Sequence, residues 1–246
     1  MKIVAIIQAR MGSTRLPGKV LLPLAGRSVL AHVVERCQAI KSVDEVVIAT
    51  TTLPQDDKIV QQGNELGVRV FRGDEQDVLG RYYVASRHTR ADVIVRITSD
   101  CPMLDPEISE RTIQAFLQKA GTHYCSNVDP RCFPRGLDTE VISFEALEQA
   151  YIHAELDYQR EHVCPYITER PERFPAASYS IQEDCSKYRW TLDTKEDYEL
   201  LCEIFSRLYV KSEVFSWFQA LELMRLYPHL HEINAHVVQK KTVDEL

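Results

Sequence analysis

Short apolar segments alternate with segments of helical periodicity along the first half of the chain, and this alternation constrains the fold more than any other feature. We expect strands at residues 3–8, 45–50, 68–71 and 93–98, and helices at 28–40, 56–66, 78–88 and 106–119. This order is typical of an α/β protein that has a parallel sheet with helices on both faces. Ligands of such sheets bind beyond the carboxyl ends of the strands, so the residues after each strand are the candidates for function.

Single residues mark several of the expected helix boundaries. Ser28 is suited to cap the helix at 28–40, because its hydroxyl can accept from a backbone N–H that has no partner within the helix. Gly67 is expected to end the helix at 56–66, and Pro106 is expected in the first turn of the helix that begins there.

The second half of the chain is less regular. It is expected to contain strands at 124–127, 137–142, 177–181 and 188–192, and helices at 144–154, 157–168, 195–208 and 214–226. No repeat and no tract rich in Gly, Ser or Pro divides the sequence. We therefore expect residues 1–246 to form a single domain, with a mid-chain arm at about residues 124–180.

The composition excludes several classes of protein. The 246 residues include 29 Lys and Arg against 36 Asp and Glu, a net charge of −7, so no nucleic-acid or membrane partner is expected. No segment approaches the roughly 18 apolar residues of a membrane span. The N-terminal apolar run ends at Gln8, which is too short for a signal peptide. Seven cysteines without C-x-x-C spacing fit buried thiols, and together these features predict a cytoplasmic protein.

A basic loop with two glycines follows the first expected strand, with the sequence QARMGSTRLPGK at residues 8–19. Backbone N–H groups of such a loop can cradle phosphate oxygens, and Arg10, Arg15 and Lys19 can neutralise a triphosphate. It is not a Walker A motif, because five residues separate the glycines and Val20 follows the lysine. An ordinary basic surface loop is the alternative, but three cations at a strand end favour phosphate binding.

Two aspartates end strand-like segments. Asp100 follows the strand at 93–98, and Asp193 directly follows the segment at 188–192. Mg²⁺ is commonly held by one or two carboxylates together with substrate phosphates, so both residues are candidate metal ligands. The alternatives are structural: Asp100 can cap the turn before Pro102, and Asp193 can cap the helix that begins near Lys195.

Five segments together resemble the cytidylyltransferase family, which includes the CMP-sugar-acid synthetases, and in particular its spore-coat polysaccharide biosynthesis protein F type. They are QARMGSTRLPGK at 8–19, RITSDCP at 96–102, PRGLDTEV at 134–141, REHVCPYI at 160–167 and RWTLDTKED at 189–197. The resemblance extends to about residue 226. It implies a Rossmann-like α/β/α sandwich of the nucleotide-diphospho-sugar transferase type, with a mainly parallel sheet and a mid-chain arm.

The resemblance also implies an activity. Members transfer a nucleoside monophosphate, here CMP by preference, from an NTP to a sugar or sugar-acid acceptor and release pyrophosphate. The implied cofactor is Mg²⁺, the implied partners are CTP and a small acceptor, and the implied pathway is surface polysaccharide biosynthesis. A homodimer formed through the arm is implied as well.

The resemblance assigns residues to each role. The implied catalytic residues are Arg10, Lys19 and Asp100, and the implied metal ligands are Asp100 and Asp193. The implied nucleotide-binding residues are Ala9, Arg10, Gly12, Ser13, Arg15, Lys19, Arg72, Gly73 and Arg81. The expected acceptor-binding residues are Arg135, Asp138, Glu140, Arg160 and His162, for which a salt-bridge network between arm and core is the alternative.

The base preference is less constrained. Residues 77–81 depart from the Ser-Gly-Thr pattern that many sugar-acid enzymes carry before the base-side arginine. Asp77 suits the cytosine amino group, or alternatively caps the helix that follows it. The sequence leaves two other functions as alternatives. A glycosyltransferase of the GT-A type usually has a D-x-D motif, whose first aspartate is replaced here by Thr98. The other is a non-catalytic nucleotide-binding module.

Overall fold

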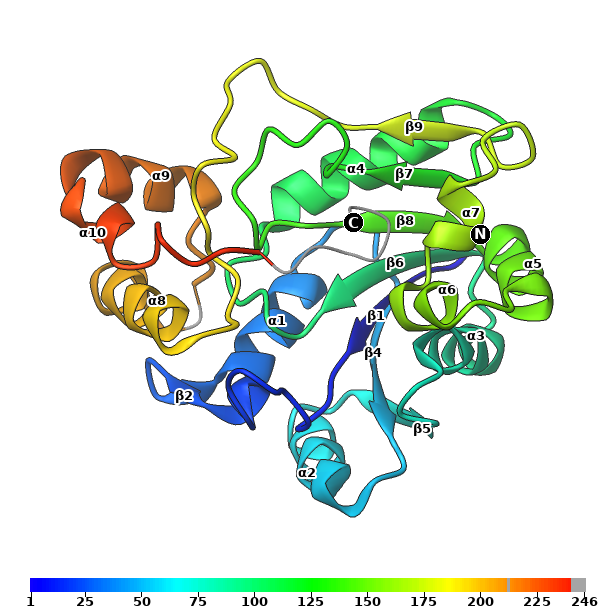
Figure 1. Cartoon of the computed structure of the whole chain (residues 1–246), viewed down its shortest axis with the longest axis horizontal. Helices are drawn as coiled ribbons and strands as arrows, with labels where there is room; N and C mark the ends of the chain where they lie inside the picture. The colour runs from blue at the N-terminus through cyan, green and yellow to red at the C-terminus, as the bar shows by residue number, and fades with distance from the viewer. Residues whose placement is uncertain (212, 240–246) are drawn as a thin grey trace.

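The computed structural model describes residues 1–211 and 213–239, and a mixed sheet runs through the centre of this part of the chain (Figure 1). The strand order is β5-β4-β1-β6-β8-β7-β9. The strands are β1 (Ile3–Gln8), β4 (Glu45–Thr51), β5 (Arg69–Gly73), β6 (Val93–Thr98), β7 (Tyr124–Ser126), β8 (Glu140–Ser143) and β9 (Ala176–Ser178). Strands β5, β4, β1 and β6 are parallel to one another, which confirms the α/β fold with a mainly parallel sheet.

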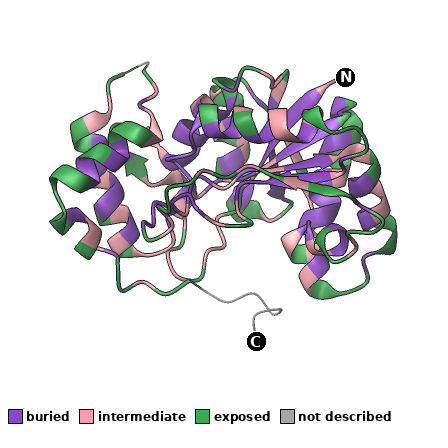
Figure 2. Cartoon of the chain, turned by 90° about the horizontal axis from the view of Figure 1, so that it is seen from above, coloured by how far each residue is buried: buried purple, intermediate pink, exposed green. Residues whose placement is uncertain are grey.

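Helices cover both faces of this sheet because the strand residues alternate between two apolar cores. Ala5 and Ile7 of β1 belong to one core, whereas Val4 and Ile6 belong to the other. Helices α1 (Val29–Gln38), α2 (Asp57–Glu65) and α4 (Pro106–Gln118) contribute to the first core, and α3 (Val78–Thr89) and α5 (Phe144–His153) contribute to the second. Figure 2 shows the buried residues concentrated in the strands and on the inner sides of the helices.

The predicted helix boundaries are confirmed by their caps. The Ser28 hydroxyl accepts a hydrogen bond from the backbone N–H of Ala31 at 3.1 Å. Gly67 follows α2 with a φ of +69°, which a residue with a Cβ rarely adopts. Pro106 lies in the first turn of α4, after the N-cap residue Asp105.

The segment at 124–180 builds one side of the sheet. Its strands β7 and β8 pair antiparallel, β8 pairs antiparallel with β6, and β9 pairs parallel with β7. The helix expected at 157–168 is instead two short helices, α6 (Asp157–His162) and α7 (Pro165–Thr168). Val163 between them has a φ of +72°, so the helical path breaks there. The division into one domain with an arm stays a prediction.

The strand expected at 188–192 was wrong. This segment makes a single bridge, between Arg135 and Arg189, because Tyr188, Trp190 and Leu192 are buried in a third apolar core instead of in the sheet. The C-terminal helices build that core: α8 (Lys195–Leu208), α9 (Trp217–Leu226) and α10 (His229–Glu232). They lie together beside the sheet (Figure 1).

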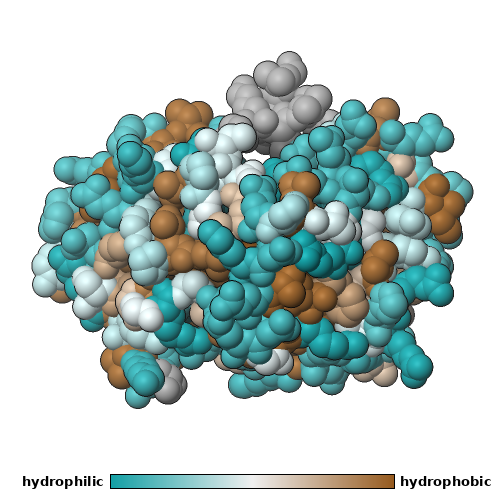
Figure 3. All heavy atoms as spheres, turned by 90° about the horizontal axis from the view of Figure 1, so that it is seen from below, coloured by the Kyte–Doolittle hydropathy of each residue, from teal (hydrophilic) through white to brown (hydrophobic). Residues whose placement is uncertain are grey.

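The outer surface is mostly polar on the face drawn in Figure 3, where apolar side chains are scattered among hydrophilic ones. Over the described residues, the helices are too short or too polar to cross a membrane. The small hairpin of β2 (Pro23–Leu24) and β3 (Arg27–Ser28) and the 3-10 helices at Lys19–Leu21 and Pro54–Asp56 complete the described elements.

Candidate active site

A cavity of about 330 Å³ lies where the carboxyl ends of β1 and β6 meet, the position that the predicted topology favours. The loop after β1, the end of β6, the start of α3 and the end of α6 surround it. Its lining residues are Gln8, Ala9, Arg10, Ser13, Thr14, Arg15, Lys19, Val20, Val78, Arg81, Thr98, Ser99, Asp100, Glu161, His162 and Asp193. We call it the nucleotide-side cavity.

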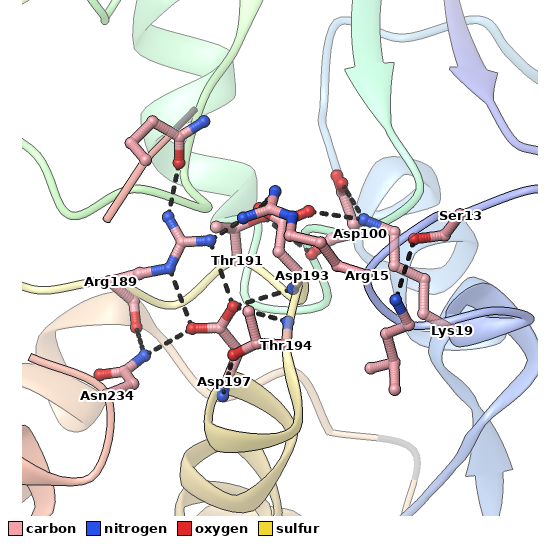
Figure 4. Close-up of polar contacts among 12 residues, drawn as sticks. Ser13, Arg15, Lys19, Asp100, Arg189, Thr191, Asp193, Thr194, Asp197 and Asn234 are labelled. Carbon is pink, nitrogen blue, oxygen red and sulfur yellow. Dashed lines mark hydrogen bonds and ion pairs between the residues drawn. The ribbon is translucent and has the colours of Figure 1, made fainter. Parts of the chain in front are cut away.

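Lys19 joins the two candidate metal ligands. Its Nζ lies 2.7 Å from Asp100 Oδ2 and 2.8 Å from Asp193 Oδ1 (Figure 4). Burial by itself would lower the pKa of Lys19, but the two carboxylates raise it above its ordinary value. Burial would likewise raise the pKa of Asp100, yet the Lys19 ammonium holds it below its ordinary value. Lys19 and Asp100 therefore stabilise each other's charged form.

Two arginines hold Asp193 from its other side. Arg15 Nη2 and Arg189 Nη2 lie 2.9 Å and 2.7 Å from Asp193 Oδ2. The Arg189 guanidinium also donates to Asp197, a fully buried carboxylate in the first turn of α8. The helix cap is Thr194, whose hydroxyl accepts from the N–H of Asp197. The alternative role of Asp193 as the cap of this helix was wrong, and its carboxylate is directed to Lys19 instead (Figure 4).

A buried carboxylate fixes the loop after β1. Asp56 is fully buried, and its Oδ1 accepts from the N–H of Met11 at 2.7 Å. The Met11 carbonyl in turn accepts from the N–H groups of Ser13 and Gly18, at 2.9 Å and 3.0 Å. Gly18 has a φ of +70°, which turns the chain into the short helix that begins at Lys19. These contacts hold the basic loop in the conformation that the structure shows.

Arg81 reaches the same cavity from α3. The residue is buried, and its Nε and Nη1 atoms have no hydrogen-bond partner among the described residues; the Oε1 atom of Gln8 is also without one. Burial lowers the pKa of Arg81, and Arg10 nearby lowers it further. A Cβ at Gly73 would lie only 2.8 Å from Arg81 Cγ, so this glycine leaves room for the arginine. Buried polar atoms without partners point to a polar ligand in this cavity.

A second cavity of about 280 Å³ adjoins the first and shares five lining residues with it: Arg15, Thr98, Asp100, His162 and Asp193. We call it the acceptor-side cavity. Its other lining residues are Cys101, Arg135, Gly136, Asp138, Thr191 and Gln239. Arg131 donates to both Asp138 oxygens, at 2.7 Å and 2.9 Å. Three of the expected acceptor residues, Arg135, Asp138 and His162, are therefore brought together here.

Two of the expected acceptor-binding residues are engaged elsewhere. Glu140 accepts from Arg96 and from the Tyr124 hydroxyl, so its carboxylate is part of a buried network around β8. Arg160 donates to Asp77. Arg160 and Glu140 therefore each form a salt bridge between the arm and the core, as the structural alternative expected.

Arg72, expected on the base side, instead donates to the carbonyls of Thr51 and Leu53 and to Asp57. Asp77 caps α3 by accepting from the N–H of Gly80 at 2.8 Å, the alternative that its position in the sequence allowed. Gly12 lines a third cavity of about 440 Å³, next to Arg10 and Arg160.

The two aspartates fit a divalent metal that is held jointly with a substrate. No cluster of three His, Cys, Asp or Glu that could hold a metal occurs in the described part of the chain. Asp100 and Asp193 nevertheless approach one point from two segments, as their shared contact with Lys19 shows. Mg²⁺ usually binds one or two carboxylates and completes its shell with waters and substrate phosphates.

Sequence reasoning missed four residues at the site: Gln8, Asp56, Arg189 and Gln239. Arg189 had a usable signal, because it lies with Asp193 and Asp197 in the segment RWTLDTKED at 189–197, one of the five that carry the family resemblance. Asp56 and Gln239 had none, because their partners, Met11 and Arg189, lie 45 and 50 residues away.

Comparison with known proteins agrees with this geometry. The cytidylyltransferase family model matches residues 4–232. The spore coat polysaccharide biosynthesis protein SpsF of Bacillus subtilis (strain 168) is 37% identical over 213 residues, which cover 83% of this chain and 87% of SpsF. A 3-deoxy-manno-octulosonate cytidylyltransferase of Trichlorobacter lovleyi is 37% identical over 121 residues, 49% of this chain and 47% of that protein.

A solved cytidylyltransferase from Leptospira borgpetersenii serovar Hardjo-bovis superimposes with a TM-score of 0.89 at 38% identity, over 99% of each chain. The family match includes both aspartates and all of the sheet except Ile3, and it favours a nucleotidyltransferase over the glycosyltransferase and the non-catalytic module. With its Rossmann-like α/β fold and its basic loop after β1, this chain belongs to the cytidylyltransferase family and is a nucleotidyltransferase.

Proposed function

We propose that this enzyme transfers CMP from CTP to a sugar or sugar-acid acceptor and releases pyrophosphate, with Mg²⁺ as cofactor. The observation that carries the proposal is the position of Lys19, Asp100 and Asp193. Asp100 and Asp193 line both the nucleotide-side and the acceptor-side cavity, and Lys19 bridges them. The names of SpsF and of the Trichlorobacter lovleyi relative support a saccharide acceptor.

The nucleotide-side cavity supplies what a nucleoside triphosphate requires. Arg10, Arg15 and Lys19 bring three positive charges to one wall. The unpartnered atoms of Arg81 and Gln8 offer N–H donors and a carbonyl acceptor to the nucleotide. A site that hydrogen-bonds a base can reject a mismatched base by a factor of about 10⁴ or more, because buried polar groups are then left without partners.

The reaction is attack of an acceptor hydroxyl on the α-phosphorus of CTP. Negative charge grows on the phosphate oxygens and on the leaving pyrophosphate, and fixed cations that face this charge lower the barrier. Lys19 contacts both aspartates, Arg15 lines both cavities, and Arg10 lines the nucleotide-side cavity. When bound by Asp100 and Asp193, Mg²⁺ supplies further positive charge to the phosphates.

His162 is the proposed contact for the acceptor hydroxyl. Its side chain lies on the wall shared by the two cavities, where the attacking hydroxyl must sit. An imidazole in this position can accept the hydroxyl proton or orient the hydroxyl by a hydrogen bond. Arg135 and Asp138 would hold the remainder of the acceptor.

Four further elements belong to the proposal. The name of SpsF supports a role in surface polysaccharide biosynthesis. We place the enzyme in the cytoplasm. Residues 1–246 act as a single domain. The segment at 124–180 carries a homodimer contact.

Pyrophosphate release with each of the four NTPs and a panel of sugars and sugar acids tests the proposal. We expect release with CTP and Mg²⁺ that depends on a sugar or sugar acid, and little or none with ATP or GTP. Mass spectrometry should detect the CMP conjugate of the acceptor. Preference for a purine nucleotide would contradict CMP transfer and leave only nucleotidyl transfer.

A further inference from the structure

The C-terminal segment, defined here as residues 233–239, begins where the family match ends at residue 232. Its last residue, Gln239, nevertheless lines the acceptor-side cavity beside Arg15, Thr191 and Asp193. The acceptor-side cavity is therefore completed by a part of the chain that the family pattern does not describe.

The start of the segment is firmly anchored. Asn234 is only 1% exposed, and its Nδ2 donates to the Arg189 carbonyl and to Asp197 Oδ1, both at 2.9 Å. Ile233 packs against the third apolar core, and the N–H of Val237 closes a turn on the Asn234 carbonyl at 3.0 Å. These contacts fix the direction in which the segment leaves the core.

The end of the segment is held by the same arginine that holds Asp193. Arg189 Nη1 donates to Gln239 Oε1 at 2.5 Å, while Arg189 Nη2 donates to Asp193 Oδ2 at 2.7 Å. Figure 4 shows the Arg189 side chain between Asp197 and Asp193. The Arg189 guanidinium thus holds both Gln239, which lines the acceptor-side cavity, and Asp193, a candidate metal ligand.

This arrangement leaves the Gln239 amide nitrogen as a donor. Its Oε1 accepts from Arg189, whereas its Nε2 has no hydrogen-bond partner in the described part of the chain. The hydroxyls of Thr98 and Thr191 and the charged groups of Arg135 and Asp138 line the same cavity. Such a polar wall suits an acceptor that carries several hydroxyls and a carboxylate.

We propose that Gln239 is an acceptor-binding residue, whose Nε2 donates a hydrogen bond to an oxygen of a sugar acid in the acceptor-side cavity. The inference rests on the proposed function, because it takes the second cavity as the acceptor subsite. Arg189 acts here as a positioning residue, since it orients the amide by occupying its oxygen.

Calorimetric binding to the full-length protein tests the inference, with 3-deoxy-manno-octulosonate and glucuronate as probes. Gln239→Ala and Gln239→Glu should each raise the Kd of the sugar acids about fivefold to tenfold, the effect of one lost hydrogen bond. The Kd of CTP should stay within about twofold of the wild-type value. Gln61→Ala, an exposed glutamine on α2, is the matched control and should change neither.

The glutamate variant separates binding from a structural role. It keeps an oxygen for Arg189 but loses the amide donors, so wild-type affinity in Gln239→Glu would overturn the inference. Unchanged affinity in Gln239→Ala, or no binding of either sugar acid to the wild-type protein, would overturn it as well. Pyrophosphate release distinguishes the two proposals. If the Gln239 variants and the wild type turn over at the same rate and bind the sugar acids equally well, the proposed function stands and the inference is rejected. If sugar-acid binding depends on Gln239 but the wild type releases no pyrophosphate, the inference stands and the proposed function is rejected.

Discussion

Lys19 and Asp193 lie 174 residues apart in the sequence, and their side chains meet at 2.8 Å. The same ammonium lies 2.7 Å from Asp100, so one cation joins the end of β6 to the segment before α8. This contact keeps two carboxylates close together that would otherwise repel each other. Under the proposed function, the phosphates of the nucleotide and the metal would meet beside this lysine.

Lys19→Ala tests the electrostatic role of this contact. We expect kcat to fall by a factor of about 10² to 10³, which corresponds to about 2.7–4 kcal/mol for one preorganised group. CTP affinity should change less, because the charge that Lys19 faces grows during the reaction. Steady-state kinetics and CTP calorimetry measure both, with the exposed Lys58→Ala as control. A variant with weak CTP binding and normal kcat would make Lys19 a simple anchor.

Asp100→Asn and Asp193→Asn test the metal ligands. Both variants should lose most turnover at saturating Mg²⁺, because an amide binds Mg²⁺ more weakly than a carboxylate does. Asp193→Asn should also lower the free energy of unfolding more than Asp100→Asn does, since Arg15 and Arg189 both lose an ionic partner. Activity against Mg²⁺ concentration and urea unfolding give the two readouts.

The exposed Asp184→Asn is the control for both variants. Near-normal activity in either aspartate variant would leave that residue a structural one.

Arg81→Met separates ligand binding from stability. The side chain is buried with two unpartnered nitrogens, so its removal should leave the unfolding free energy of the ligand-free protein unchanged or higher. Stabilisation by CTP should fall; for the wild type it is about 2.7 kcal/mol at 100 times the Kd. Thermal shift with and without CTP measures both effects. A variant that is less stable without CTP but equally stabilised by it would show that Arg81 is structural.

Asp56→Ala tests how the basic loop is held. Loss of the buried carboxylate leaves the Met11 N–H without its partner, which should destabilise the protein by about 1–3 kcal/mol. The loosened loop should also bind CTP less tightly. The neighbouring Asp57→Ala removes an exposed carboxylate and should do neither. If the two variants bind CTP equally well, the contact between Asp56 and Met11 does not preorganise the loop.

His32 predicts a pH dependence of stability. Burial lowers its pKa, as do Arg27 and Arg36 nearby; the Leu24 carbonyl, which accepts from its Nε2 at 2.7 Å, and Glu35 oppose the shift. As the pH falls, His32 is therefore protonated in the unfolded chain, near pH 6.5, before it is protonated in the folded protein. The stability contributed by neutral His32 is present above about pH 6.5 and is lost as the pH falls below it.

Urea unfolding of the wild type and of His32→Gln, over the range from about pH 7.5 to 5.5, measures this dependence. The difference in unfolding free energy between the two proteins should shrink as the pH falls. A constant difference would show that His32 keeps its ordinary pKa.

The sequence by itself determined the parallel half of the sheet, because period and turn residues are local signals. The alternation before residue 120, the cap at Ser28 and the stop at Gly67 were all readable for this reason. It also determined that the loop carrying Lys19 and the strand end carrying Asp100 lie at one edge, since parallel strands end on the same side.

Only the tertiary structure decided which side chains face the cavities. Arg72 and Glu140 lie near strand ends, but both form ion pairs away from the site. Arg72 pairs with Asp57, and Glu140 pairs with Arg96. Gln239 lines the acceptor-side cavity, and Arg189 contacts Asp193 and Gln239, because the C-terminal helices pack beside the sheet and bring these segments together. Sequence periodicity fixes which face of an element is buried, whereas the pairing of charges between distant segments depends on how those elements pack.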